Sequence, residues 1–387
     1  MPEVRLQSII FAAVLAFSAS VAQAAAGEAR IPDATQVPIA LMIDMTSSQV
    51  LYERQVDRRF VPASITKVMT AYTAFELIKA GELNTNAVYT VRPDTFSKWR
   101  RRGSTMFLGL DSKPTVNQLL HGITTVSAND GSVVLAEGAA GSVEAWTDLM
   151  NASAQEIGMR NSHFANPNGW MDDGKTFVTA RDLGRLAQAM IGRHPELYST
   201  YFGKREYSFN GITQSNHDPL SGTVQGADGI KTGFTYEAGF GFLGTARRQG
   251  RRLVMVVGGA NSQRIRRDAS RDFMEWGFSA FDNRYLFNAG DSVGTARVQN
   301  GDAFHVDLVA AGPVRVSVPK AYDGNLDMHI EYEGPLRAPI RTEERVATLI
   351  ISGERVPEAR IPLYAAKPVS TAGPLDRVLN AVLSFFV

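Results

Sequence analysis

The apolar residues of this chain follow a helical period in some stretches and a strand pattern in others. One helical face is formed by Ile65, Val68, Met69, Tyr72 and Phe75. Pro62 fixes φ just before this face, and Lys79 and Gly81 supply the cation and the glycine that are typical of a helix end. The pattern therefore predicts a helix over residues 65–81 that buries one face.

Helical periods continue through the middle of the chain. They predict helices over residues 116–123, 133–140, 145–157, 179–191 and 264–281. Thr115 and Thr179 precede two of these segments and are expected to cap them. Gly192 and Pro195 are expected to end the fourth helix. Residues 86–115 instead alternate short extended runs with polar turns.

Other apolar runs have no helical period and predict strands. They include residues 38–45, 50–52, 206–209, 239–246 and 253–259. Past residue 282, short β-type runs punctuated by Gly and Pro replace the helical pattern. The chain is therefore expected to belong to the mixed α/β (α+β) class. An antiparallel sheet with a helical subdomain would occupy residues 30–283, and a small all-β sandwich domain residues 284–366.

The two ends of the chain carry apolar segments of another kind. Residues 9–17 form an apolar run too short to span a bilayer, and Ala22-Gln23-Ala24 has the small-x-small pattern of a secretory cleavage site. We therefore expect a signal peptide over residues 1–24 and an exported protein. Residues 367–387 are expected to hold a linker and an amphipathic helix with an apolar stripe from Leu375 to Phe386. That helix can lie in a membrane interface or pack on its own domain, and the membrane interface is the favoured interpretation.

Composition narrows the classes of chemistry. The chain has 387 residues, with 40 basic and 39 acidic side chains and a net charge of +1, so nothing indicates a nucleic-acid partner. Cysteine is absent, which excludes disulfides, thiolate catalysis and cysteine-based zinc sites. The six histidines are scattered, so no metal and no cofactor are expected. The run Arg100-Arg101-Arg102 is either a solvated face or the border of a site for an acidic ligand.

Three short segments carry candidate chemistry. Ser64 lies at the start of the first helix, where the dipole favours negative charge, and Lys67 follows one turn later on the same face. A desolvated lysine can lose its proton and act as a base. Ser127-x-Asn129 would place a hydroxyl and an amide on a loop between two helices. Lys231-Thr232-Gly233 would lie on a strand edge, where glycine lets a ligand approach the backbone. Each segment alone is also common in ordinary structural settings.

The three segments in this order resemble the motif set of penicillin-binding proteins and class A β-lactamases, which has S-D-N as its middle element. Longer stretches resemble the low-molecular-mass penicillin-binding proteins of the penicillin-binding protein 5/6 type, which are serine D-alanyl-D-alanine carboxypeptidases. These stretches are Pro62-Ala-Ser-Ile-Thr-Lys-Val-Met-Thr-Ala-Tyr72, Ser127-Ala-Asn-Asp130 and Asp228-Gly-Ile-Lys-Thr-Gly233. The resemblance covers nearly the whole chain and implies a β-lactamase/transpeptidase-like catalytic domain.

The resemblance implies a role for each matching residue. Ser64 would be the nucleophile that forms an acyl-enzyme, with Lys67 as its base. Ser127 and Lys231 would pass the proton to the departing D-alanine, and Asn129 would hold the substrate amide.

The substrate-binding residues are implied in the same way. Lys231, Thr232 and Gly233 would line the binding strand, and Thr232 and Arg266 would bind the terminal carboxylate. Backbone N–H groups of Ser64 and Phe234 would form the oxyanion hole. Phe234 stands where relatives often have histidine or another polar residue, and residues 216–219, Asn-His-Asp-Pro, replace a more usual Asn-basic-Asn-Gly turn.

The implied reaction removes the terminal D-alanine of peptidoglycan stem pentapeptides, which limits cross-linking, and β-lactams would acylate the same serine. The implied location is the periplasm, with the C-terminal helix on the inner membrane surface. The alternatives are a D,D-endopeptidase, a β-lactamase of the same fold or a non-enzymatic wall-binding scaffold. A class A β-lactamase needs a glutamate-held water, and the extra β-domain and the expected C-terminal anchor argue against that class.

Overall fold

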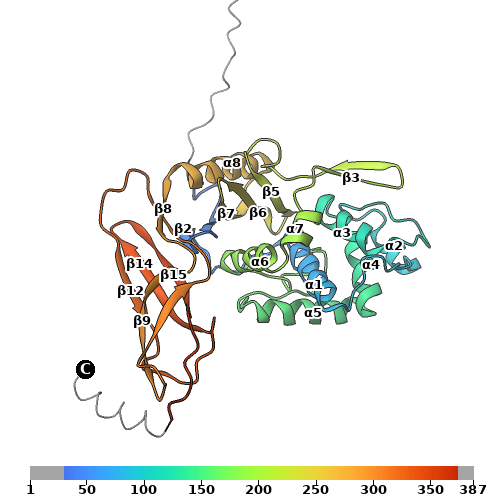
Figure 1. The fold of residues 1–387 in the computed structure, drawn as a ribbon. Helices are drawn as coiled ribbons and strands as arrows, with labels where there is room; N and C mark the ends of the chain where they lie inside the picture. Colours follow the sequence, from blue (N-terminus) through green and yellow to red (C-terminus); the bar gives the residue numbers. More distant parts are fainter. Residues whose placement is uncertain (1–29, 374–387) are drawn as a thin grey trace, which may run out of the picture.

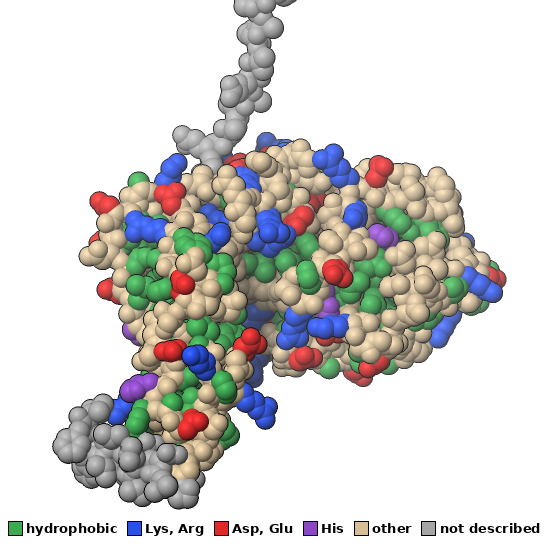
Figure 2. All heavy atoms as spheres, in the orientation of Figure 1, with side chains coloured by type: hydrophobic (Ala, Val, Ile, Leu, Met, Phe, Trp, Pro, Cys, Tyr) green, Lys and Arg blue, Asp and Glu red, His purple; other side chains and the backbone are tan. Residues whose placement is uncertain are grey.

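The structure is a computed structural model that describes residues 30–373 (Figure 1). The predicted signal peptide and the apolar stripe of the predicted C-terminal helix lie outside these residues. Between residues 30 and 373, no helix is long and apolar enough to cross a membrane. Figure 2 shows basic and acidic side chains interspersed over one face of the molecule.

The N-terminal part of the chain is built on a five-stranded antiparallel sheet. Its order is β2 (Gln49–Arg54), β1 (Ile39–Asp44), β7 (Arg251–Ala260), β6 (Gly239–Arg248) and β5 (Ala227–Thr235). Successive residues of a strand face opposite sides of the sheet. On β1, Leu41 and Ile43 join the core under the central helices, while Ala40 and Met42 join the core under α8 (Gln263–Ser279). The sheet is therefore covered by helices on both faces.

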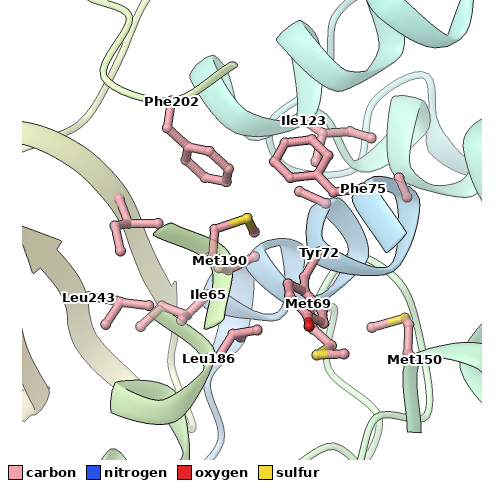
Figure 3. Packing of buried hydrophobic residues seen from close by; sticks show 14 of the residues in the cluster. Ile65, Met69, Tyr72, Phe75, Ile123, Met150, Leu186, Met190, Phe202 and Leu243 are labelled. Carbon is pink, nitrogen blue, oxygen red and sulfur yellow. The ribbon is translucent and has the colours of Figure 1, made fainter. Parts of the chain in front are cut away.

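Helix α1 (Thr66–Ala80) lies at the centre of the helical side of the sheet. Figure 3 shows Met69, Tyr72 and Phe75 pointing into a core shared with residues from other helices and from β6. Every residue of α1 from Thr66 to Phe75 is buried, so the helix is enclosed on all sides and not on one face as its spacing predicts. Its predicted end is confirmed, because Gly81 adopts φ 77° there.

Seven further helices or helical turns of the described chain accompany α1 and α8. They are η1 (Ala63–Ile65), α2 (Pro93–Trp99), α3 (Val116–Thr125), α4 (Asn129–Ala140), α5 (Val143–Glu156), α6 (Ala180–Arg193) and α7 (Pro195–Tyr201). Thr115 caps α3 in a capping box with Gln118, as its sequence predicts. Thr179 caps α6 by accepting from the backbone N–H of Asp182. A hairpin of β3 (Glu206–Phe209) and β4 (Ile212–Ser215) projects beyond α3.

Two short helices are missing from the sequence-based prediction. Helix α2 lies in the stretch that was expected to contain only extended runs and turns, and α7 begins at the proline that was expected only to end α6. In both helices proline is the first residue, where its missing N–H costs no hydrogen bond. Each prolyl residue therefore starts a helix, a role that the apolar period of so short a segment does not reveal.

The C-terminal part of the described chain is all β, as the sequence predicts. A six-stranded sheet contains β9 (Ser292–Gln299), β10 (His305–Ala310), β12 (Asp327–Glu331), β13 (Leu336–Arg337), β14 (Arg345–Gly353) and β15 (Val356–Ala365). A second sheet pairs β8 (Phe281–Phe287) with β11 (Val314–Pro319). Val316 of β11 shares one buried core with Leu308 and Leu349 of the larger sheet, so the two sheets pack on each other.

Residues 367–372 do not behave as the predicted linker. Val369 exchanges two backbone hydrogen bonds with Ile340, and the N–H of Ala372 donates to the carbonyl of Asn300. Val369 and Ala372 are also buried. This segment therefore belongs to the β-domain, whose edge satisfies its backbone groups.

A buried polar network joins the two domains beside β2. Arg251 and Asp44 of the N-terminal sheet form an ion pair of 2.6 Å between Nε and Oδ2. The hydroxyl of Ser317 in the β-domain donates to the same carboxylate oxygen at 2.6 Å. The Gln49 amide accepts from the backbone N–H of Ser317 at 2.6 Å and donates to its carbonyl at 3.0 Å. The network satisfies its buried charges with partners from both domains.

We predict that Asp44→Asn destabilises the protein strongly, because it leaves the Arg251 guanidinium buried without a counter-charge. Removing one partner of a buried ion pair costs about 3–5 kcal/mol. The matched control is Asp57→Asn, which breaks the more exposed pair with Arg181 and should cost about 1 kcal/mol or less. Chemical unfolding of both variants measures the difference, and equal losses would contradict the prediction.

Candidate active site

The nucleophile candidate Ser64 lies in the 3₁₀ turn η1, directly before α1. Two glycines from distant segments press against this turn. A Cβ atom at Gly233 of β5 would collide with the carbonyl oxygen of Pro62, and a Cβ atom at Gly169 would collide with that of Ala63. The absence of side chains at both positions lets β5 and the loop around Gly169 enclose the Ser64 turn.

Lys67 is 1 % exposed and has three hydrogen-bond partners. Its Nζ lies 3.0 Å from Ser64 Oγ, 2.7 Å from Asn129 Oδ1 and 2.6 Å from the backbone carbonyl oxygen of Asn168. Burial, and then the charge of Lys231, hold the pKa of Lys67 well below its usual value, while Asp130 opposes them. Both causes favour the neutral amine more than it is favoured in a lysine exposed to water.

The second wall of the site follows α3. Ser127 adopts a left-handed φ of 64°, and Asn129 begins α4, so only Ser127 lies on the short loop that was predicted to hold both. The Asn129 amide donates to the carbonyl of Arg102 at 2.9 Å, which fixes the direction of its Oδ1 toward Lys67. Asp130 accepts from the backbone N–H groups of Met106 and Leu108, and so ties the preceding loop to α4.

The third wall is the edge strand β5. Lys231 is almost completely buried, and its Nζ donates to the carbonyl of Thr232 at 3.1 Å. Burial and the nearby Arg266 guanidinium lower the pKa of Lys231 to about 7, against the pull of Asp218. Arg266 on α8 is itself buried, which lowers its pKa to about 10. Its Nε is buried and has no hydrogen-bond partner among the described residues.

These walls enclose one cavity of about 310 Å³. Its lining includes seven of the predicted site residues, namely Ser64, Ser127, Asn129, Thr232, Gly233, Phe234 and Arg266. Lys67 and Lys231 lie directly behind this lining, bonded to Ser64 and Thr232. The structure therefore brings all the predicted residues to one place. Within residues 30–373, no group of His, Asp and Glu side chains is arranged to hold a metal ion.

Several lining residues have no counterpart in the prediction. Trp170, His217 and Phe240 contribute to the wall, and Asn168 contributes a backbone carbonyl to Lys67. The Phe234 ring stacks on Phe240 with 4.1 Å between ring centroids and is 44 % exposed. Burial, followed by the charges of Lys231 and Arg266, lowers the pKa of His217. Only the unusual turn at residues 216–219 gave a signal in the sequence.

A serine hydroxyl beside a buried amine, with a second serine and further cations in one cavity, defines an enzyme that transfers acyl groups through serine. Comparison with known proteins agrees with this class. The family described as D-alanyl-D-alanine carboxypeptidase matches residues 26–262, and the C-terminal domain of penicillin-binding protein 5 matches residues 281–371. The chain belongs to the D-alanyl-D-alanine carboxypeptidase family.

Relatives match over nearly the whole chain. D-alanyl-D-alanine carboxypeptidase DacC of Escherichia coli K12 is 32 % identical over 353 residues, which are 89 % of this chain and 87 % of that protein. The crystal structure of penicillin binding protein 5 from Haemophilus influenzae superposes with a TM-score of 0.76 at 28 % identity, covering 87 % of this chain and 98 % of that one. Penicillin-binding protein D2 from Listeria monocytogenes, in its ampicillin-bound form, gives a TM-score of 0.56 at 29 % identity, covering 63 % of this chain and 98 % of that one.

These findings confirm three of the expectations from the sequence. The protein has the transpeptidase-like fold of penicillin-binding proteins with a C-terminal all-β domain. It belongs to the predicted family, and it is a serine-type D-alanyl-D-alanine carboxypeptidase.

Proposed function

We propose that this enzyme removes the terminal D-alanine of peptidoglycan stem pentapeptides through an acyl-enzyme on Ser64, and thereby limits cross-linking. The observation that carries the proposal is the 3.0 Å contact between Lys67 Nζ and Ser64 Oγ, with the amine buried and its pKa depressed. A neutral amine at this distance can take the hydroxyl proton as the oxygen attacks.

Acylation uses the groups around the Ser64 turn. Lys67 removes the Ser64 proton, and Oγ bonds to the carbonyl carbon of the penultimate D-alanine. The oxyanion that forms is held by the backbone N–H groups of Ser64 and Phe234. Asn129 holds the substrate amide with the second N–H of its side-chain amide, because the first is engaged by Arg102.

Departure of D-alanine uses the opposite side of the cavity. Ser127 and Lys231 deliver a proton to the leaving nitrogen as the peptide bond breaks. Arg266 and Thr232, which both line the cavity, bind the terminal carboxylate, whose negative charge is attracted by the guanidinium. Water then adds to the acyl carbonyl carbon and gives one proton back to the pair Ser127 and Lys231, while the proton held by Lys67 returns to Ser64 Oγ as the ester bond breaks and the shortened peptide leaves. A β-lactam acylates the same oxygen.

We predict that Ser64→Ala abolishes covalent labelling by a fluorescent penicillin and the release of D-alanine from a pentapeptide. The matched control is Ser104→Ala, which changes another serine of the cavity lining and should keep the adduct. Mass measurement of the protein after penicillin treatment locates the adduct, and an adduct on the Ser64→Ala protein would exclude Ser64 as the nucleophile. The unaltered enzyme separates the alternatives. Cleavage of cross-links without attack on pentapeptide would indicate an endopeptidase, and rapid turnover of β-lactams would indicate a β-lactamase. Absence of both activities and of D-alanine release would indicate a scaffold.

The two lysines predict a bell-shaped dependence of kcat/KM on pH. Activity rises as Lys67 loses its proton and falls as Lys231 loses the proton that it delivers to the leaving nitrogen. Because the pKa of Lys231 is lowered to about 7, the falling limb should lie far below that of an exposed lysine. Arg266→Gln removes a neighbouring cation, so it should raise KM and move this limb to higher pH. A limb that stays in place would contradict the role of Lys231.

We also propose that the two domains expected from the sequence hold with shifted bounds: the β-domain begins at residue 281 with β8 and extends to residue 372. Export to the periplasm and attachment to the inner membrane rest on the patterns of residues 1–24 and 375–387. Deleting residues 375–387 should release the protein from membranes without loss of D-alanine release. Sedimentation with membrane vesicles measures this, and a truncated protein that still sediments would remove the membrane-anchor proposal.

A further inference from the structure

Residues 166–170 form a turn that contacts α1 on both sides of the catalytic lysine. The carbonyl of Asn168 accepts from Lys67 Nζ, and the carbonyl of Pro167 accepts from the hydroxyl of Thr70, each at 2.6 Å. Gly169 follows with φ 72° and lies against the carbonyl of Ala63, the residue before the nucleophile. The turn is therefore held in contact with Lys67 and with the backbone next to Ser64.

The side chain of Asn166 holds this turn in place. Its Oδ1 accepts from the backbone N–H of Gly169 at 2.6 Å and from that of Asn168 at 3.2 Å. Its Nδ2 donates to Asp172 Oδ2 at 2.7 Å and to the carbonyl of Trp170 at 3.1 Å. The N–H of Gly169 and the C=O of Asn168 belong to one planar peptide group and point in opposite directions. Holding that N–H therefore fixes the direction of the carbonyl that faces Lys67.

Counting donors shows what this carbonyl does for the lysine. A neutral amine has two N–H bonds and one lone pair. The Asn168 carbonyl and Asn129 Oδ1 can only accept, whereas the Ser64 hydroxyl can also donate. Both N–H bonds are therefore drawn to the two asparagines, and the lone pair is left facing the Ser64 proton.

We propose that Asn166 is a positioning residue for acylation: by fixing the Asn168–Gly169 peptide, it aims the lone pair of Lys67 at the hydroxyl of Ser64. The inference rests on the proposed role of Lys67 as base. Asn166 acts through the backbone and touches no reacting atom.

The test is the rate constant of acylation by a fluorescent penicillin, measured with Asn166→Ala. The rate constant should fall about tenfold to a hundredfold, because a misaligned base loses part of the rate enhancement that general-base catalysis supplies. The fraction of enzyme that is finally labelled should stay unchanged, whereas a merely structural lesion lowers that fraction and leaves the rate constant.

The pH dependence supplies a second readout. The charged groups that act on Lys67 are Lys231 of β5 and Asp130 of α4, and both are intact in the variant. Losing one acceptor disfavours the ammonium more than the amine, so the rising limb should move to lower pH.

Asn151→Ala is the matched control. Asn151 makes two hydrogen bonds to the backbone of Phe164, earlier in the same loop, and none to residues 166–170. It should lower stability but keep the rate constant within about twofold. Equal rate losses in both variants would overturn the inference.

If Asn166→Ala does not fold, a second set of variants that exchanges the amide and the carboxylate of residues 166 and 172 tests the same inference. Asn166→Asp alone places a carboxylate against Asp172 and should slow acylation, while adding Asp172→Asn restores a donor and an acceptor and should recover most of the rate. Failure of the double variant to recover, with full labelling, would overturn the inference. Wild-type acylation by Lys67→Ala would instead overturn the role of the base itself.

Discussion

The structure depends on burying an amine beside a serine hydroxyl. A lysine that is 1 % exposed cannot keep its charge without compensation, and it cannot remain without hydrogen bonds. Three oxygen atoms meet this requirement, and they come from η1, from α4 and from the loop after α5. Since these segments are far apart in sequence, the site exists only when the sheet and the helical subdomain are assembled. The enclosure of α1 on all sides follows from the same requirement.

Close backbone approach makes this assembly possible. Gly169 and Gly233 come from two distant segments and both lie against the Ser64 turn. A methyl group at either position would collide with a backbone carbonyl oxygen of that turn. The edge position of β5 leaves one side of that strand open to a peptide ligand, because β6 pairs with the other side. Gly233 therefore serves two purposes: it lets β5 pack closely on the Ser64 turn, and it lies on the strand whose free edge can receive a ligand.

Local rules predicted much of this fold. Gly81 ends α1 and Thr115 caps α3 because few residue types can adopt a left-handed φ or accept a backbone N–H at a helix end. Lys67 reaches Ser64 because a spacing of three residues places both on one helical face. The Asn168 carbonyl was not predictable, since every residue carries the same group and only tertiary structure selects one. The buried link between Asp44 and Ser317 was hidden for a similar reason, because it joins residues of two domains.

The distribution of charge around the cavity explains how two neighbouring lysines can work in different protonation states. Lys231 and Arg266 face the cavity with Asp218 as the acidic group that opposes their mutual repulsion. In the proposed mechanism, a substrate carboxylate bound there raises the pKa of Lys231 and keeps it charged. A charged Lys231 in turn lowers the pKa of Lys67. In the proposed mechanism, binding of the carboxylate therefore favours a proton on Lys231, which donates one, while burial and the charge of Lys231 favour the neutral form of Lys67, which accepts one.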